Sequence, residues 1–167
     1  MRIIGIDPGY AIVGYGIIDY SSNHFSVVDY GAVTTKAHTP FDSRLSTIYD
    51  GLTQLISMYK PDAMSIEKLF FNTNTTTAID VAQARGVIVL AAAQGGLDIA
   101  EYTPLQVKQS VVGYGRAEKK QVQEMTRLML NLKSVPKPDD TADALALAIC
   151  HAHSASSMLG RINFNGG

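Results

Sequence analysis

Four acidic residues occupy positions at which protein folds commonly gather ligands, and they are Asp7, Glu67, Asp140 and Asp143. Asp7 ends a short apolar segment, and Gly9 follows two residues later, where the missing Cβ lets the chain turn sharply and a ligand come close. Glu67 ends a second apolar segment in the same relation. Ligands collect at the carboxyl ends of strands in open α/β sheets, so both acids are well placed. Either acid alone could equally be an ordinary solvated residue at the end of a strand.

Asp140 and Asp143 stand three residues apart at the start of a predicted helix whose inward face carries Leu145 and Ile149. Residues at this spacing share one helix face, so both carboxylates can point to the same place. The same pattern fits an acid at the N-cap followed by an acid in the first turn, where carboxylates favour the helix dipole. Capping explains one acid well and explains less easily why Asp139 crowds beside the other two. Both interpretations stay open at this level.

Convergence of the four carboxylates would predict a metal site. Such a cluster repels itself strongly unless cations neutralise it. Hard oxygen ligands suit Mg²⁺ or Mn²⁺, and the sequence offers no set of Cys and His residues of the kind that zinc prefers. Two such ions activate a water molecule and stabilise the leaving oxygen of a phosphodiester. The acids therefore predict a Mg²⁺-dependent nuclease, for which Mn²⁺ would substitute, with Asp7 as the bridging ligand.

Hydrophobic periodicity predicts the elements that must position these acids. Strands are expected over residues 2–7, 12–19, 25–34, 63–67 and 97–102, and helices over residues 43–59, 77–94, 104–112, 119–132 and 140–153. This order predicts an α/β protein with a five-stranded mixed sheet flanked by helices on both faces. It matches the ribonuclease-H-like arrangement, although other α/β folds share the order. Residues 1–153 are expected to form one nuclease domain, and the small, polar residues 154–167 a flexible C-terminal tail.

Composition and charge narrow the class of protein. The chain has 167 residues, 46% hydrophobic and 17% charged, as expected for one globular domain. The absence of a secretory signal pattern and of an apolar run of about 18 residues predicts a cytoplasmic protein. Residues 104–137 carry seven Lys or Arg against two Glu, whereas residues 1–103 carry a net charge of −4. A basic segment beside acidic clusters suits a protein that binds a polyanion and metal, although basic helices are often only solvated faces.

Six stretches, in this order along the chain, resemble the RuvC family of bacterial Holliday-junction resolvases: IGIDPG (4–9), IEKLF (66–70), QARG (83–86), QVKQSVVG (106–113), AEK (117–119) and DTADALA (140–146). The resemblance implies a ribonuclease-H-like fold, a homodimer, and symmetric nicking of two opposed strands at a four-way DNA junction. It also implies cooperation with the branch-migration proteins RuvA and RuvB. The acidic positions of the family fall on the four acids named above, and some relatives carry His at the third, so Asp140 is the most replaceable.

The same resemblance extends to five residues that would contact DNA. Phe70 matches an aromatic that stacks on bases at the opened crossover, although it could also belong to the core. Lys108 and Lys119 match family lysines near the scissile backbone, where they would hold phosphates. Arg116 and Lys120 flank Lys119 and would add contacts to the DNA backbone, unless they are simply solvated.

Arg85, in the QARG stretch, is interpreted as a structural residue or one near a dimer interface, and Gly86 as a site of close helix packing.

Three other functions compete with a resolvase. The Gly5–Gly9 loop also resembles the first phosphate loop of sugar kinases and actin-like ATPases, but the chain has no second such loop. The others are a DNA-binding module without activity and a related nuclease acting on an RNA–DNA hybrid.

Overall fold

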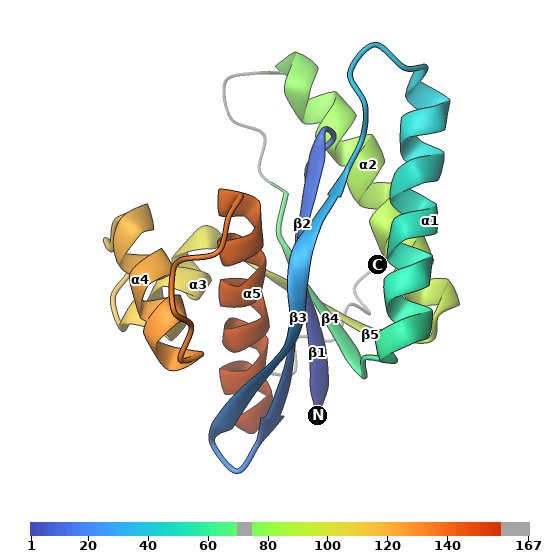
Figure 1. Cartoon of the computed structure of the whole chain (residues 1–167). Helices are drawn as coiled ribbons and strands as arrows, with labels where there is room; N and C mark the ends of the chain where they lie inside the picture. Colours follow the sequence, from blue (N-terminus) through green and yellow to red (C-terminus); the bar gives the residue numbers. More distant parts are fainter. Residues whose placement is uncertain (70–74, 158–167) are drawn as a thin grey trace.

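A five-stranded mixed sheet forms the centre of the molecule, in the order β3-β2-β1-β4-β5 (Figure 1). The computed structural model describes residues 1–69 and 75–157, with the backbone alone for residues 75 and 76. The strands are β1 (Arg2–Asp7), β2 (Ile12–Ser21), β3 (His24–Thr34), β4 (Ala63–Glu67) and β5 (Asp98–Tyr102). Strands β1, β2 and β3 pair antiparallel, whereas β4 pairs parallel with both β1 and β5. The predicted five-stranded mixed sheet is confirmed.

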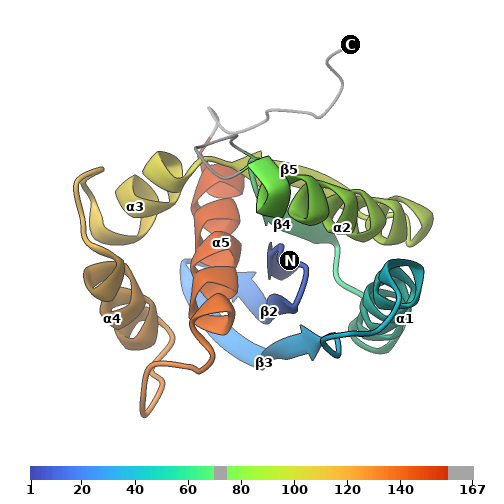
Figure 2. The ribbon, with the colours of Figure 1, turned by 90° about the horizontal axis from the view of Figure 1, so that it is seen from above.

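Helices cover both faces of this sheet, as predicted. They are α1 (Phe41–Tyr59), α2 (Thr75–Gln94), α3 (Pro104–Val112), α4 (Lys119–Met129) and α5 (Asp139–Ser156). Figure 2 shows α1 and α2 on one face and α5 on the other, with α3 and α4 outside α5. Alternation along β1 divides the core, because Ile3 packs on the α5 side while Ile4 and Ile6 pack toward α1 and α2.

The C-terminal ends of two helices differ from the sequence-based expectation. Helix α4 ends at Met129 rather than at residue 132, because Asn131 has a left-handed backbone with φ of 52°. Helix α5 continues to Ser156, so the first three residues of the predicted tail are helical, and Ala152 just before them is buried. Residues 158–167 lie outside the described residues. In the described part of the chain, no helix is long and apolar enough to cross a membrane.

Helix α5 packs directly against the central strands because the strand residues that face it are small. Gly5 of β1 pairs with Gly16 of β2 and, on the other side, with Ser65 of β4. A Cβ atom on Gly5 would lie only 1.9 Å from the carbonyl oxygen of Ala144 in α5. The buried Ser65 hydroxyl donates a 2.7 Å hydrogen bond to the carbonyl of Leu147. Larger side chains along this row would lift the helix off the sheet.

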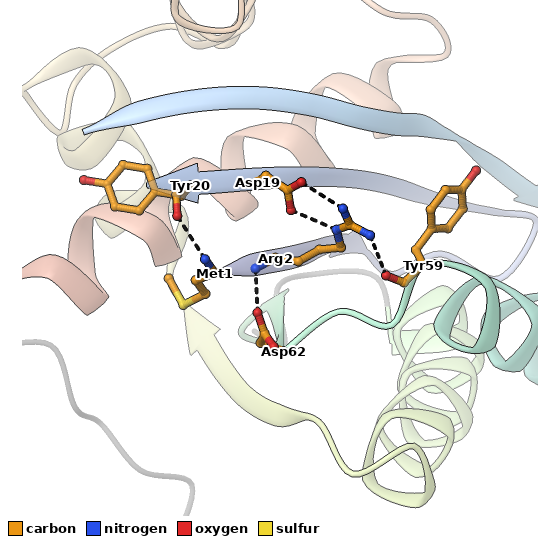
Figure 3. A network of polar contacts seen from close by, with 6 residues as sticks. All are labelled: Met1, Arg2, Asp19, Tyr20, Tyr59 and Asp62. Atoms are coloured by element: carbon orange, nitrogen blue, oxygen red, sulfur yellow. Dashed lines mark hydrogen bonds and ion pairs between the residues drawn. The ribbon is translucent and has the colours of Figure 1, made fainter. Parts of the chain in front are cut away.

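A network of polar contacts closes the sheet at the amino end of β1 (Figure 3). Nε and Nη2 of Arg2 donate to the two carboxylate oxygens of Asp19 on β2, each at 2.8 Å. Nη1 of Arg2 donates to the carbonyl of Tyr59 at the end of α1, and the Arg2 amide donates to Asp62 just before β4. The Arg2 guanidinium, through its hydrogen bonds, holds the pKa of Asp19 below its usual value. One arginine thus ties together β1, β2, α1 and the start of β4.

Candidate active site

Asp7 and Glu67 stand side by side at the carboxyl ends of two neighbouring strands. Strands β1 and β4 pair in parallel with Ile6 opposite Ile66, and each acid is the next residue along. Asp7 shares the side of β1 that carries Gly5, because side chains alternate along a strand, so it points toward α5. Both acids are half-buried. The parallel pairing expected from the sequence therefore brings these two carboxylates to one edge of the sheet.

The first turns of α5 bring Asp140 and Asp143 to the same place. Gly14 is the β2 residue opposite Asp7, and a Cβ atom there would lie 2.1 Å from the carbonyl oxygen of Asp140. The start of the helix is thus pressed against the strand next to Asp7. The N-cap residue of α5 is Pro138, and within the described residues no side chain caps it. The capping box considered for this segment is not formed, although Asp139 and Asp140 do lie in the first turn, where acids favour the helix dipole.

Electrostatics shows that the four acids act on one another. Burial, followed by the charges of Asp143, Glu67 and Asp140, raises the pKa of Asp7 to about 8. Burial, followed by the charge of Asp143, raises the pKa of Glu67. The pKa of Asp143 is raised as well, mainly by burial and in spite of an opposing lysine. Burial and mutual repulsion of this kind disfavour the charged carboxylates, and a bound cation would stabilise them.

That opposing lysine is Lys119, the first residue of α4. Its Nζ lies 3.0 Å from Oδ2 of Asp143 and 3.7 Å from Oδ2 of Asp139. The hydrogen bond to Asp143 raises the pKa of the lysine. The sequence predicts Lys119 as a ligand of phosphate, and it gives no signal for this contact with an acid. The same ammonium group also contacts Asp139, which brings this acid into the site. In the sequence, only the closeness of Asp139 to Asp140 and Asp143 pointed to such a role.

A pocket of about 200 Å³ opens beside the acids. Its charged lining consists of Glu67, Asp143, Lys108 and Lys119, and its remaining walls are mostly apolar residues of α3, α4 and α5. Lys108 is held there by α3, whose start is fixed by a capping box between the side chains of Thr103 and Gln106 and the backbone. The pocket therefore places two cations and two carboxylates around one space.

The remaining predicted DNA contacts fall elsewhere. Arg116 lies in the loop before α4, and its side chain is exposed. Lys120 is also exposed, and it borders a separate open groove along α4 together with Glu124 and Leu128. Lys108 and Lys119 therefore line the pocket beside the acids, whereas Arg116 and Lys120 do not. Phe70 lies outside the described residues.

Comparison with known proteins identifies the family. Residues 3–151 match the family described as Crossover junction endodeoxyribonuclease RuvC. The chain belongs to the RuvC family. It is 60% identical over 166 residues to the RuvC of Ruminiclostridium cellulolyticum, covering 98% of this chain and 100% of that one. It is 64% identical over 154 residues to the RuvC of Alkaliphilus metalliredigens, covering 92% and 94% of the two chains.

Solved structures agree with this RuvC assignment. The structure of Thermus thermophilus RuvC in complex with Holliday junction substrate superimposes with a TM-score of 0.88 at 33% identity, over 93% of this chain and 94% of that chain. The ribonuclease-H-like α/β fold expected from the order of elements is thereby confirmed, as is the resemblance of the six motifs. The enzyme class, an endodeoxyribonuclease, follows from the family.

The donor set of this RuvC chain fits a hard divalent cation. Asp7, Glu67, Asp140 and Asp143 offer only carboxylate oxygens, the ligands that Mg²⁺ and Mn²⁺ prefer. As the side chains stand, no three acidic, His or Cys residues in the described ranges are gathered closely enough to hold an ion. Lys119 instead supplies positive charge at Asp143. Binding of an ion would require the carboxylates to turn toward one point, which rotation about their side-chain bonds allows.

Proposed function

We propose that this protein resolves four-way DNA junctions by hydrolysing one phosphodiester in each of two opposed strands. The observation that carries the proposal is the gathering of Asp7, Glu67, Asp140 and Asp143 at one sheet edge, beside a pocket lined by two lysines. Membership of the RuvC family supports the substrate, since a T. thermophilus relative is described in complex with a Holliday junction.

We further propose a division of labour among the residues of the site. The four acids would hold Mg²⁺, or Mn²⁺ in its place, and the bound ions supply an activated water and stabilise the leaving oxygen. Asp7, which feels the charge of the other three acids, is suited to the central position in that set. Lys108 and Lys119 border the same pocket and would hold the phosphate backbone against the acids. Lys119 would leave Asp143 as phosphate and metal arrive.

A homodimer is proposed from the outer surface of α2. Ile79, Gln83, Gly86 and Leu90 are exposed and follow the spacing of one helix face. The two large residues of this stripe, Ile79 and Leu90, are 56% and 50% exposed. At Gly86, apart from its chain neighbours and the backbone of its own helix, no described atom lies within 4 Å of the position a Cβ would take, so another helix could approach closely. A two-fold dimer places one active site on each of two equivalent strands of a junction.

Sedimentation of the purified protein tests the dimer. The wild type should sediment as a dimer at micromolar concentration, and Leu90→Glu should sediment as a monomer with an unchanged circular dichroism spectrum. A monomeric wild type would refute the proposal. A Leu90→Glu variant that stays dimeric would place the interface away from α2.

From the motif resemblance we also propose RuvA and RuvB as partners, and their addition should alter the rate of junction cleavage.

Cleavage of defined substrates tests the enzymatic proposal. A synthetic four-way junction and a linear duplex of the same sequence would be incubated with the protein in Mg²⁺ or in EDTA. We expect paired, symmetric nicks in the junction with Mg²⁺, little cutting of the duplex, and none of either in EDTA. Equal cutting of both substrates, or cutting in EDTA, would contradict a metal-dependent, junction-selective nuclease.

A further inference from the structure

An ion pair joins α2 and β5 next to Glu67 of the acidic cluster. Nη2 of Arg85 lies 2.8 Å from Oε2 of Glu101, and the two side chains are 14% and 20% exposed. It is the least exposed ion pair among the described residues. Burying two charges is costly, and an apolar pair of similar size is often as stable or more stable. A large contribution to stability therefore does not explain this pair, and its position in the fold has to be considered.

The pair sits at the end of the strand that carries Glu67. Strand β4 ends at Glu67, where the ladder with β5 also ends. Glu101 is the β5 residue opposite Ile66, and Tyr102 is opposite Glu67. Nε of Arg85 points at the backbone carbonyl of Glu67, at a donor–acceptor distance of 3.4 Å. A single guanidinium thus contacts a β5 side chain and the main chain of a residue whose own carboxylate belongs to the acidic cluster.

We propose that Arg85 is a positioning residue that fixes the backbone of Glu67 and thereby the direction of its carboxylate. The inference rests on the proposed function. Arginine suits this task because its planar, forked guanidinium can contact two groups at once with little loss of side-chain freedom, whereas a lysine ammonium presents a single point charge. With 14% of its side chain exposed, Arg85 offers little surface to DNA. Its neighbour Gly86 belongs to the exposed stripe of α2, so the same helix presents the proposed dimer surface and the clamp on Glu67.

The test compares three variants of the full-length protein. Arg85→Met removes the charge and both contacts while keeping a long side chain, and Arg85→Lys keeps the charge beside Glu101 but loses the fork. Arg2→Met is the matched control, because Arg2 makes an arginine–carboxylate contact that ties together β1, β2 and α1 at the opposite end of the sheet. The measurements are the midpoint of thermal unfolding with and without Mg²⁺, the junction Kd in EDTA, and the single-turnover cleavage rate at saturating protein, below the unfolding range of every variant.

Positioning predicts a split between these measurements. Arg85→Met should lose about 10–100-fold in single-turnover rate, the range seen when partners of metal ligands are removed. Its junction Kd should change less than about threefold, and Mg²⁺ should raise its unfolding midpoint less than it raises that of the wild type. Arg85→Lys should recover part of the rate. Arg2→Met should lower the unfolding midpoint while its cleavage rate stays within about twofold of the wild type.

Other outcomes separate this inference from the proposed function. A wild type that does not cleave junctions refutes the proposed function itself. A wild type that cleaves, together with an Arg85→Met variant of equal rate, refutes positioning alone. Equal rate losses in Arg85→Met and Arg2→Met at equal losses of stability would also refute it, because the effect would then follow stability. If Arg85→Met does not fold, Arg85→Lys decides, since wild-type rate and wild-type response to Mg²⁺ in that variant would overturn the proposal.

Discussion

The acidic groups at the two ends of β1, a strand of only six residues, lie in opposite electrostatic environments. At the amino end, the guanidinium of Arg2 donates to the carboxylate of Asp19 and its backbone amide donates to Asp62, and the hydrogen bonds from the guanidinium lower the pKa of Asp19 (Figure 3). At the carboxyl end, burial and three neighbouring acids raise the pKa of Asp7 to about 8. At the first end Asp19 is paired with Arg2, whereas at the second end Asp143 is paired with Lys119 and the carboxyl groups of Asp7, Glu67 and Asp140 add to the same cluster.

This difference has opposite consequences for stability. Asp19, with a lowered pKa, stabilises the fold above the carboxyl pKa of the unfolded chain, and that stability is lost as the pH falls through its folded pKa. Asp7, with a raised pKa, takes up protons in the fold, so its effect on stability becomes steadily less favourable as the pH rises from 3.8 to about 8. Near neutral pH one end of the strand stabilises the protein, and the other opposes folding until a cation binds.

The largest effect should come from Asp7→Asn. This change removes the acid that feels the charge of all the others, so we expect a loss of about 10³–10⁴-fold in single-turnover cleavage of a four-way junction. Junction affinity in EDTA should be equal to that of the wild type or higher, because a negative charge near the DNA is removed. Loss of binding would mean that Asp7 maintains the fold rather than the chemistry.

Gly14→Ala should have the next largest effect, because it displaces one end of the site without removing an acid. A Cβ atom at Gly14 would lie 2.1 Å from the carbonyl of Asp140, so the start of α5 must move away from β2. We expect a loss of stability of about 1–3 kcal/mol and a reduction in cleavage of about 10-fold or more. Urea unfolding and the junction assay measure the two effects. An unchanged cleavage rate would show that α5 can shift without separating Asp140 from Asp7.

The pH dependence of stability tests the electrostatic part of the comparison. In EDTA, Asp7→Asn should be more stable than the wild type by about 1–3 kcal/mol at pH 9, because ionised Asp7 no longer opposes folding. At pH 5 the advantage should be smaller, since Asp7 is then largely protonated in the folded wild type. Chemical denaturation at both pH values gives the difference. An equal advantage at pH 5 and pH 9 would show that repulsion within the site does not destabilise the fold.

The sequence predicts the acidic end of β1 better than the neutralised end. Asp7 and Glu67 follow apolar strands, and that pattern alone places both at the carboxyl edge of a parallel pair. Period and order also predict every strand and helix of the described chain to within a few residues at each end. The bond between Arg2 and Asp19 has no such signal, because it joins residues seventeen apart through the pairing register of β1 and β2, which only the folded hairpin defines.

Contacts between helices, and between helices and the sheet, were not predicted for the same reason. Glycines alternating at positions 14 and 16 of a strand were an available signal for a helix lying very close to that strand, but α5 could be assigned to that seat only from the structure. The ion pair of Lys119 with Asp143 and the contacts of Arg85 depend on how α4 and α2 pack, which local patterns do not determine. Side-chain partners between helices therefore required the structure, whereas the placement of acids along strands did not.

Asp19→Asn should have the smallest effect. The Arg2–Asp19 pair is partly open to solvent, with side chains 36% and 43% exposed, so its loss should reduce stability by at most about 1 kcal/mol at pH 7. The difference from the wild type should disappear as the pH falls through the lowered folded pKa of Asp19, where the wild-type carboxylate takes up a proton. Junction cleavage should be unchanged, because the pair lies at the opposite end of β1 from the acids. A variant that loses cleavage at full stability would show that the two ends are coupled along the strand, and the division between a neutralised structural end and a charged functional end would then fail.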